Sequence, residues 1–414
     1  MNRIYNLRLT KGSLSIIAAC FLLIMALPDM AKSVELGEGI DFNAQMRWRG
    51  ELDGRDFDNG TPLFETPLLR TRMGLSIAAI DNTRLFFQLQ DSRNLGTNSS
   101  GLANDTNLGV HQAYIKLLKF LHEDMNLQLG RFQAFYGRQR LIGAVGWSNV
   151  GRVFDGIRAS YKTDEFKVDL FSLKIVERGF RAIPDYRDWV LYGIYGTLME
   201  NQLDLFWLFD WDQANAGGDH ALRRYTAGLY FNHFMDSGLK VEFDAAFQGG
   251  KAADMNIAAF MFAGDLTYEM DDIFQKVGFG FDITSGDEDP LDNDINTFNN
   301  LYYTGHKFRG YMDYFIGSPA EGLFNLVLRA SLKPNDKFAL LIDLHHFQTM
   351  KKYALGVDEE SSQVGQEIDV TAKFPLEKGL GLQCGTSLFL ASDDFIADSD
   401  PALWFYAMLT AGIK

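Results

Sequence analysis

Cysteine is almost absent from this chain of 414 residues, which contains only two. Cys20 lies in the N-terminal segment that we interpret as an export signal, so the mature chain keeps Cys384 alone. An internal disulfide is therefore excluded, and an exported protein of this size must be held by its own hydrogen bonds and packing.

Long apolar runs are also missing after the first 30 residues, and the mean hydropathy is −0.11. A polytopic helical membrane protein is thereby excluded, since each helix needs about 20 apolar residues. A membrane β-barrel stays possible because its lipid-facing and lumen-facing residues alternate, and their hydropathies cancel in any window.

The chain lacks an excess of basic charge. It has 39 Lys and Arg against 54 Asp and Glu, a net charge of −15. Nucleic acid is therefore not expected as a partner, because a phosphate-binding surface needs a basic excess. We interpret the acidic residues mainly as hydrated loop residues that keep the protein soluble.

Proline is scarce, with nine residues. A proline cannot donate to a β-ladder, so a closed barrel excludes it from strand interiors. Seven prolines fall in predicted loops or turns and an eighth, Pro375, closes a predicted strand. The seven are Pro62, Pro67, Pro184, Pro290, Pro319, Pro334 and Pro401.

The sequence shows a strong two-residue periodicity instead. In residues 239–248 every odd position is apolar and nearly every even one is polar or charged, and residues 276–284 and 366–374 repeat this pattern. Alternation alone also fits a soluble sandwich. A membrane barrel is favoured because the polar face carries charges of both signs and glycines, and because no helical segment of credible length interrupts the pattern.

These segments predict an all-β fold: a single antiparallel transmembrane β-barrel of about 18 strands, with short periplasmic turns and long extracellular loops. The predicted strands are 40–50, 68–80, 82–92, 108–118, 125–133, 151–163, 165–176, 188–199, 201–211, 222–235, 238–249, 256–270, 275–285, 322–333, 335–348, 364–375, 379–391 and 401–413. The predicted extracellular links are 51–67, 93–107, 134–150, 286–321, 349–363 and 392–400.

Residues 306–317 could form a nineteenth strand. Including them would reverse the rhythm of short and long links for the rest of the chain, whereas leaving them in a long outer loop restores an even strand count. We therefore predict eighteen strands, a barrel wide enough to leave an aqueous channel unless loops fold inward.

The N-terminus predicts an export signal. Arg3, Arg8 and Lys11 form its basic part and residues 13–27 its apolar part, with cleavage expected after Ser33. A lipoprotein signal at Cys20 is the alternative, but the apolar stretch continues past that cysteine. The predicted organisation is a cleaved signal of residues 1–33 and a barrel of residues 34–414.

Two neighbouring stretches resemble the signature of the alginate-export family of outer-membrane barrels: residues 129–143 (LGRFQAFYGRQRLIG) and 146–156 (GWSNVGRVFDG). Further pieces fit the same family: 88–93 (QLQDSR), 111–114 (HQAY), 306–313 (HKFRGYMD) and 365–369 (GQEID). The resemblance implies a lumen with clustered arginines and carboxylates. The characterised type exports the anionic polysaccharide alginate, but the family is broad and the substrate does not transfer.

Assigning the polar face of each strand to the lumen predicts the residues that meet a solute. Arginines and carboxylates are both among them, and two of the arginines lie in a loop that we expect to fold inward. The predicted pore-lining residues are Arg70, Arg72, Arg131, Arg138, Arg140, Arg152, Arg158, Arg329, Glu242, Asp244, Asp282, Asp343, Glu367 and Asp369.

Arg131 is the exception, because strict alternation puts it on the apolar face. Either a bulge re-aims it or it lies beyond the hydrocarbon zone, since an arginine at the bilayer midplane costs about 2–4 kcal/mol. The arginines as a group fit a constriction that binds carboxylate or phosphate. The alternative is a lumen wall that Arg–carboxylate pairs merely stiffen.

The predicted function is a channel in the outer membrane of a Gram-negative-type bacterium for a hydrophilic, anionic solute or polysaccharide. Expected partners are outer-membrane lipids and the barrel-assembly machinery; periplasmic partners stay unknown. A surface receptor or adhesin with a plugged lumen, using loops 286–321 and 349–363, is one alternative. An outer-membrane enzyme is another, but His345, Ser331 and the acids show no spacing typical of a catalytic site. We expect no enzyme.

No cofactor is expected, although two acidic loop clusters could bind calcium through oxygen ligands. These are Asp287, Glu288, Asp289, Asp292 and Asp294, and Asp393, Asp394, Asp398 and Asp400. Tryptophans near strand ends fit interfacial aromatic girdles. They are Trp48, Trp189, Trp207, Trp211 and Trp404.

Overall fold

The structure is a computed structural model that describes residues 34–96, 107–178, 188–198, 200, 202–213, 221–289, 291–356 and 359–413. The export signal predicted for residues 1–33 lies outside the described residues. Among those described, no helix is long and apolar enough to cross a membrane.

The described residues form strands and one short 3-10 helix. The elements are β1 (Val34–Gly37), β2 (Ile40–Gly54), β3 (Phe64–Ile80), β4 (Thr83–Asn94), β5 (Leu108–Leu118), β6 (Met125–Phe132), β7 (Phe154–Lys162), β8 (Lys167–Val176), β9 (Trp189–Leu198), β10 (Leu203–Asp212), β11 (Leu222–Phe234), β12 (Leu239–Ala252), β13 (Met255–Glu269), β14 (Phe274–Thr284), β15 (Asp294–Ile295), η3 (Gly305–Lys307), β16 (Leu323–Asn335), β17 (Phe338–Ala354), β18 (Glu360–Glu377), β19 (Leu380–Ala391) and β20 (Ala402–Ile413).

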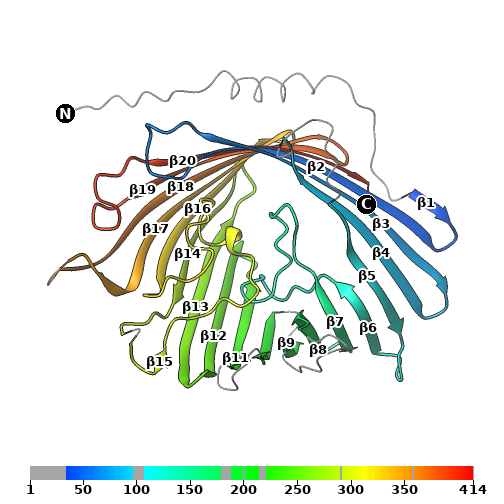
Figure 1. Ribbon diagram of the computed structural model, residues 1–414. Helices are drawn as coiled ribbons and strands as arrows, with labels where there is room; N and C mark the ends of the chain where they lie inside the picture. The colour runs from blue at the N-terminus through cyan, green and yellow to red at the C-terminus, as the bar shows by residue number, and fades with distance from the viewer. Residues whose placement is uncertain are drawn as a thin grey trace.

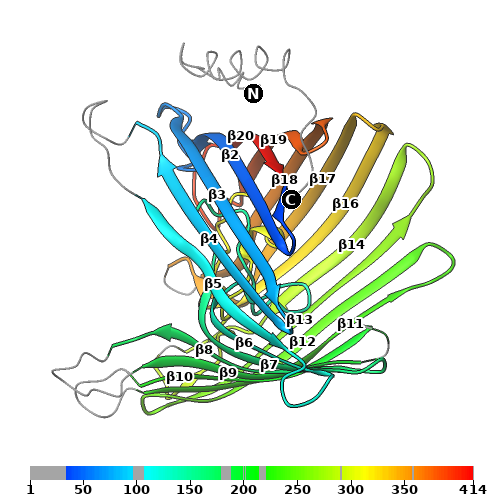
Figure 2. The same ribbon diagram turned by 90° about the vertical axis from the view of Figure 1, so that its right-hand side faces the viewer.

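Eighteen of the strands, β2–β14 and β16–β20, close into one antiparallel barrel (Figures 1 and 2). Each pairs with the next along the barrel, and β2 pairs with β20 from Ala44–Ile413 to Gly54–Leu403. The closed ladder leaves no sheet edge, so main-chain polar groups are satisfied within the barrel even where lipid surrounds it. The predicted fold class and strand number are confirmed.

The outer face carries a belt of exposed apolar side chains while neighbouring residues point inward. On β17, for example, Leu344 is 43% exposed and His345 is 4% exposed. Members of the belt come from strands all around the barrel: Ile115, Ile157, Leu170, Ile194, Leu205, Phe247, Leu266, Phe279, Leu328 and Leu344. Such a belt suits the hydrocarbon of a bilayer.

Two predicted loops are shorter than expected because their strands continue further. The link between β2 and β3 is 55–63 rather than 51–67, and β17 and β18 reach into 349–363. Residues 306–317 form no barrel strand, as predicted, and contain only part of η3.

Two prolines predicted in loops or turns lie within strands. Pro67 is in β3, where its carbonyl accepts from the main-chain N–H of Leu95. The nitrogen of Pro67 therefore faces the same side, beyond the last residue of β4, so only the reciprocal bond at the end of this ladder is missing. Pro334 is in β16 at an irregular step of the hairpin between Leu332 and Asn335.

Two long links turn into the barrel (Figure 1). We name residues 133–153, between β6 and β7, the first inward segment. Residues 285–322, between β14 and β16, are the second inward segment. Because β14 pairs directly with β16, the second segment leaves and re-joins the wall at neighbouring strands. Its β15 pairs in parallel with the start of β13, and residues after β15 enter the lumen.

Candidate functional site: an arginine-lined constriction

The two inward segments join each other inside the barrel. The N–H of Gly143 donates to the carbonyl of Tyr302 at 2.8 Å, and the N–H of Tyr302 donates to the carbonyl of Leu141 at 2.8 Å. A parallel β-bridge links Ile142 to Tyr302. The segments therefore form one body that narrows the channel.

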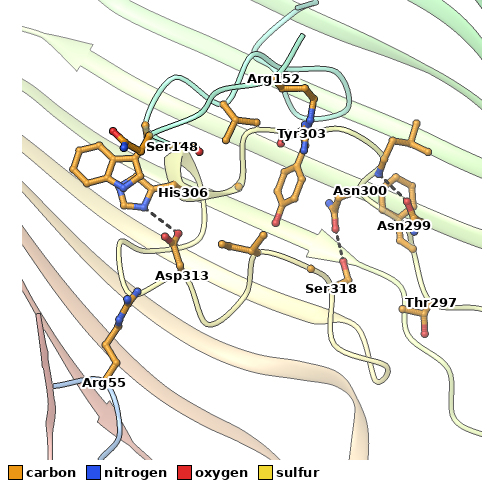
Figure 3. A pocket seen from close by; sticks show the side chains of 18 of the residues that line it. Arg55, Ser148, Arg152, Thr297, Asn299, Asn300, Tyr303, His306, Asp313 and Ser318 are labelled. Carbon is orange, nitrogen blue, oxygen red and sulfur yellow. Dashed lines mark hydrogen bonds and ion pairs between the residues drawn. The ribbon is translucent and has the colours of Figure 1, made fainter. Parts of the chain in front are cut away.

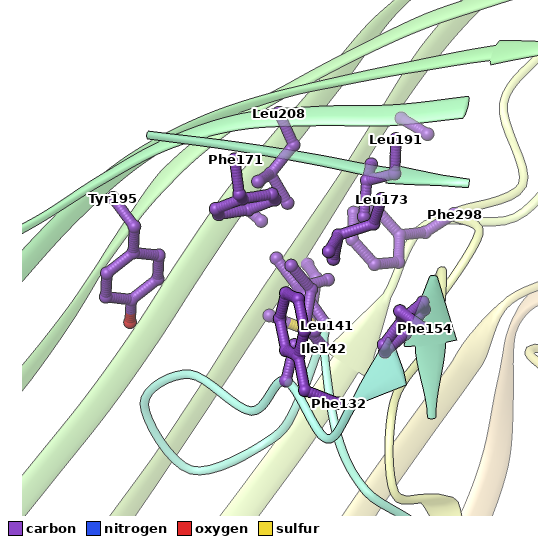
Figure 4. Close-up of a cluster of buried hydrophobic side chains, with 14 residues drawn as sticks. Phe132, Leu141, Ile142, Phe154, Phe171, Leu173, Leu191, Tyr195, Leu208 and Phe298 are labelled. Carbon is purple, nitrogen blue, oxygen red and sulfur yellow. The ribbon is translucent and has the colours of Figure 1, made fainter. Parts of the chain in front are cut away.

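An apolar cluster seats this body on the lumen wall (Figure 4). Ile142 of the first segment is 1% exposed and packs among inward side chains of β8–β10 such as Leu173, Leu191 and Leu208. Burying one side chain of this size stabilises the docked position by about 1.5–3 kcal/mol. The inner face of the barrel is thus apolar here, although lumen faces were expected to be polar.

Next to this apolar cluster lie four inward carboxylates from three neighbouring strands, which we name the carboxylate cluster. They are Glu242 and Asp244 on β12, Asp265 on β13 and Asp282 on β14. Arg140 of the first segment contacts Asp282 at 2.5 Å through Nη1 and Asp244 at 3.2 Å through Nε. Arg309 of the second segment contacts the other oxygen of Asp282 at 3.2 Å. One carboxylate therefore ties both segments to the wall.

Arg138 completes this arrangement. Its Nη1 lies 2.5 Å from Asp265 and its Nε 3.6 Å from Glu242. Burial lowers the pKa of Arg138, but the carboxylates of Asp265 and Glu242 outweigh it, so the net pKa is raised. The guanidinium stays charged, and the loop predicted to fold inward is held by buried ion pairs.

Carboxylates on β18 hold the second segment through its main chain. Glu367 Oε1 accepts from the N–H of Met312 at 2.8 Å, and Asp369 Oδ2 accepts from the N–H of Tyr311 at 3.2 Å. Gly310 makes this approach possible: its φ is 78°, and an added Cβ would lie 2.3 Å from Glu367 Oε2. Only glycine fits both constraints without strain.

The opposite wall carries four inward arginines, which we name the arginine cluster: Arg47 and Arg49 on β2, Arg70 and Arg72 on β3. They donate to main-chain carbonyls of the first inward segment. Arg47 reaches the oxygens of Gly146 at 2.9 Å and Ser148 at 3.0 Å. Arg70 reaches the same two oxygens at 3.2 and 3.0 Å.

The other two arginines extend this pattern. Arg49 donates to the carbonyl of Trp147 at 2.7 Å. Arg72 donates to the side chain of Gln90 at 2.6 Å, which in turn donates to the carbonyl of Val150 at 2.8 Å. The acceptors from the segment are all neutral, in contrast to the carboxylates that hold Arg138 and Arg140.

A cavity of about 770 Å³ is lined by residues of both inward segments (Figure 3). Trp147 stacks on His306 with ring centres 4.3 Å apart, and His306 Nδ1 lies 2.9 Å from Asp313. Arg152 donates to the carbonyl of Tyr303 at 3.1 Å. Burial lowers the pKa of Arg152 from its ordinary value. The lining thus combines arginines and aromatic rings with the carboxylates of Glu51 and Asp313.

Arg131 does not belong to this site. It lies on the outward face of β6, bonded to Asp155 on β7 at 2.6 Å and 2.8 Å, and its side chain is 43% exposed. Its inclusion among pore-lining residues is corrected, because alternation along β6 turns Gln128 and Phe132 inward instead.

The remaining predicted residues face the lumen away from the arginine cluster. Arg158 donates to Gln128 at 2.6 Å. Arg329 is ion-paired with Asp265 and lies 3.8 Å from Asp343. Arg158–Gln128 and Arg329–Asp343 link neighbouring strands, whereas Arg329–Asp265 reaches from β16 to β13 across β14. The structure does not bring Arg158 or Arg329 to the inward segments' carbonyls.

A family model described as alginate export matches residues 39–404, a span from the start of the barrel into its last strand. The chain belongs to the alginate-export family. No curated protein is significantly similar to it in sequence.

Solved porins share the fold of this alginate-export family member. Pseudomonas aeruginosa OccK5 (OpdH) matches with a TM-score of 0.59 and 12% identity over 92% of this chain and 99% of that chain. A BenF-like porin from Pseudomonas fluorescens matches with a TM-score of 0.61 and 8% identity over 91% and 99%. OpdK of P. aeruginosa, solved with vanillate, gives 0.57 and 10% over 91% and 98%.

Together these matches make the protein a channel-type barrel of the kind found in Gram-negative outer membranes. Identities this low show the fold alone and carry no residue roles across.

Sequence reasoning about this alginate-export barrel missed several residues of the site. Arg47 and Arg49 occupy alternate positions of a predicted strand, as Arg70 and Arg72 do, and the same rule would have found them. Arg309 was seen only as part of a motif, because nothing local shows that its segment enters the barrel.

Two tryptophans expected in the interfacial girdles lie inside the barrel. Trp404 is 1% exposed and packs edge-on against Trp147, with ring centres 6.0 Å apart. Trp189 donates to the inward Asp210 at 2.6 Å. Both occupy inward positions of their strands, so alternation decides their place and closeness to a strand end does not.

Neither acidic loop cluster gains support as a calcium site. Among the described residues, which include every carboxylate of both clusters, no three His, Cys, Asp or Glu side chains are arranged to hold a metal ion.

Proposed function

We propose that this protein is a selective outer-membrane channel in which an anionic, hydrophilic solute passes along the arginine cluster. The observation that carries this proposal is the uncompensated charge of Arg47, Arg70 and Arg72. Within the described part of the chain, none of the three has a carboxylate within ion-pairing distance; Arg49 alone contacts one, Glu51 at 2.7 Å.

The wall that carries the carboxylate cluster supports the same interpretation. There, the carboxylate cluster is balanced by Arg138, Arg140 and Arg309, so it offers little attraction to a passing cation. A guanidinium without a carboxylate partner binds carboxylate or phosphate through two parallel hydrogen bonds. The constriction is therefore anion-selective despite the net charge of −15.

Ion selectivity tests the proposal directly. Purified full-length protein in planar bilayers under a KCl gradient should give a reversal potential on the anion side. Replacing both Arg47→Gln and Arg70→Gln should shift it towards cations, whereas Arg84→Gln, an exposed arginine near a short turn, should leave it unchanged. A wild-type protein that conducts no ions or prefers cations contradicts the proposal.

A receptor barrel with a plugged lumen is a second candidate, favoured by the way both inward segments are tied to the wall. It predicts ligand binding without conductance in the same recordings. An enzymatic role has weaker support, since His345 is occupied with Asn325 at 3.0 Å and lies 3.8 Å from Asp369. We propose that the protein is not an enzyme.

A further inference from the structure

Two cations lie side by side on the outer face of the barrel, on neighbouring strands. Arg223 on β11 and Lys251 on β12 are directly opposite each other, and both are exposed. Alternation fixes their direction, because the neighbouring Arg224 turns inward and pairs with Asp210 at 3.3 Å. We name Arg223 and Lys251 the outer cation pair. It belongs to the surface that meets lipid and is separate from the lumen.

A row of directly opposed residues sets the level of the outer cation pair on the barrel. The row runs from β6 to β12 through Arg131, Asp155, Lys174, Val190, Trp211, Arg223 and Lys251. Arg131 is the last residue but one of β6, just before the first inward segment. That segment leaves from the end of the barrel that the sequence predicts to be extracellular. The outer cation pair therefore lies near the extracellular end.

The other cations of this row are neutralised by carboxylates, whereas the outer cation pair is not. Arg131 contacts Asp155 at 2.6 Å. Lys174 contacts two carboxylates, one of them at 2.7 Å. Among the residues that the structure describes, neither Arg223 nor Lys251 has a carboxylate within ion-pairing distance. The positive charge of the row is therefore concentrated at these two side chains.

The outer cation pair is suited to a ligand with two negative charges. Like charges at directly opposed positions of a sheet destabilise it, since the two Cβ atoms are only about 5 Å apart. A phosphate monoester lying across both side chains would remove this repulsion, because it carries a charge of about −1.5 to −2 at pH 7 and three acceptor oxygens. A phosphate diester carries a single negative charge and matches only half of the pair.

Four aromatic side chains adjoin the outer cation pair on the same face. They are Trp207, Phe209 and Trp211 on β10 and Tyr225 on β11. Phe209 and Tyr225 stack with ring centres 4.8 Å apart, and the rings of Trp207 and Trp211 flank Phe209 at 6.2 and 5.9 Å. Tryptophan and tyrosine gather at the level of lipid headgroups. The outer cation pair is therefore placed where the headgroups of the outer leaflet lie.

The surface next to the outer cation pair also has room for an acyl chain. Gly249 lies two residues before Lys251 on β12, directly opposite Tyr225, and an added Cβ there would meet no atom nearer than 3.9 Å. Its partner on β13 is another small residue, the exposed Ala258. Phe247, two residues further along β12, is 56% exposed. A chain starting at the cations can thus run over Gly249 towards the apolar belt.

We propose that the outer cation pair binds an acylated glycolipid of the outer leaflet through a phosphate monoester on its sugar headgroup. The aromatic rings beside the pair offer apolar faces against which the C–H face of a sugar packs. The acyl chains of the glycolipid lie on the belt below. The inference does not depend on the proposed anion-channel function, because the site faces lipid and shares no residue with the arginine cluster.

Native mass spectrometry of the full-length protein in detergent tests the inference. The probe is lipid A, an acylated glucosamine disaccharide with two phosphate monoesters. Its Kd should be at least about tenfold lower than that of phosphatidylglycerol, a phosphate diester without a sugar. Equal affinity for the two lipids overturns the inference, because it would show a surface that binds acyl chains alone.

Two further ligands separate the sources of the phosphate. Phosphatidic acid has a phosphate monoester but no sugar, and it should bind less tightly than lipid A. Equal binding of phosphatidic acid contradicts the assignment to a glycolipid. An excess of inorganic phosphate should leave lipid A bound, and its displacement would show a site for free phosphate instead.

Removing the charges should remove the affinity. Arg223→Gln with Lys251→Gln should raise the Kd for lipid A by about thirtyfold, the equivalent of about 2 kcal/mol, since each cation near an anionic headgroup contributes about 1 kcal/mol. Arg84→Gln with Lys337→Gln is the matched control, because it removes the same charge at exposed positions near two short turns. Unchanged binding in the first variant overturns the inference.

A conservative variant guards against loss of binding through misfolding. Arg223→Lys with Lys251→Arg keeps both charges and should bind lipid A within about threefold of the wild-type protein. Binding as weak as in the double glutamine variant contradicts a site held by two charges. Lipid A should also raise the temperature of heat denaturation of the wild-type protein and leave that of the double glutamine variant unchanged. An equal rise in both proteins also contradicts the site.

Discussion

Arg47 and Arg70 lie directly opposite each other on β2 and β3, and both donate to the same two carbonyls, those of Gly146 and Ser148. Like charges at directly opposed positions of a sheet destabilise it. The carbonyl dipoles between the two guanidiniums reduce this repulsion without cancelling the charge. The constriction consequently keeps a positive potential that a solute can use.

Removing Arg140 should undock the first inward segment and leave the barrel folded. In Arg140→Met, the buried carboxylates of Asp244 and Asp282 each lose a partner, a change that costs about 3–5 kcal/mol. Amide exchange in residues 133–144 should rise strongly, while the heat denaturation of the barrel changes little. Unchanged exchange there would show that the ion pairs do not hold the segment.

Truncating Ile142 in the apolar cluster should also undock the first inward segment, because apolar burial is lost. Ile142→Ala leaves a cavity against Leu173 and Leu191, and such truncations cost about 2–5 kcal/mol. Exchange in residues 133–144 is again the measurement. Leu121→Ala, at a turn residue that is 84% exposed, serves as the control and should change nothing.

Arg131→Gln should leave ion selectivity unchanged, because Arg131 pairs with Asp155 on the outer face. The measurement is the reversal potential, recorded beside the Arg47→Gln and Arg70→Gln double variant. A shift towards cations with Arg131→Gln would return this residue to the lumen and contradict the structure.

A cation on the apolar belt should weaken folding into lipid. Leu328→Arg puts a charge on an outward side chain that is 55% exposed on β16, where a bilayer midplane position costs about 2–4 kcal/mol. Reversible unfolding in lipid vesicles measures the difference. Lys333→Arg near the end of β16 keeps its charge and is the matched control, with no expected change.

The barrel could be predicted from the sequence because its signal is local. Each strand is specified by its own alternation, and residues 239–248 already show which side chains of β12 face inward. Where both faces are apolar, the signal weakens: Leu170 and Phe171 on β8 point to opposite sides of the wall. The apolar cluster on the inner face of β8–β10 was missed for that reason.

An arginine constriction could be predicted, but its contacts could not, because the partners are distant in sequence and many are main-chain atoms. Arg47 and Gly146 are 99 residues apart, and a carbonyl acceptor leaves no trace in residue type. Arg138 and Arg140 do point into the barrel, as expected. Their carboxylate partners could not be predicted, because these depend on how deeply the segment enters the lumen.

Trp147 lies across the line where the barrel closes. It contacts Arg49 on β2 and the rings of Trp404 and Tyr406 on β20, the two strands that join the beginning and the end of the chain. Trp147 therefore braces this junction from inside the lumen, and its replacement by alanine should lower the resistance of β2 and β20 to being pulled apart.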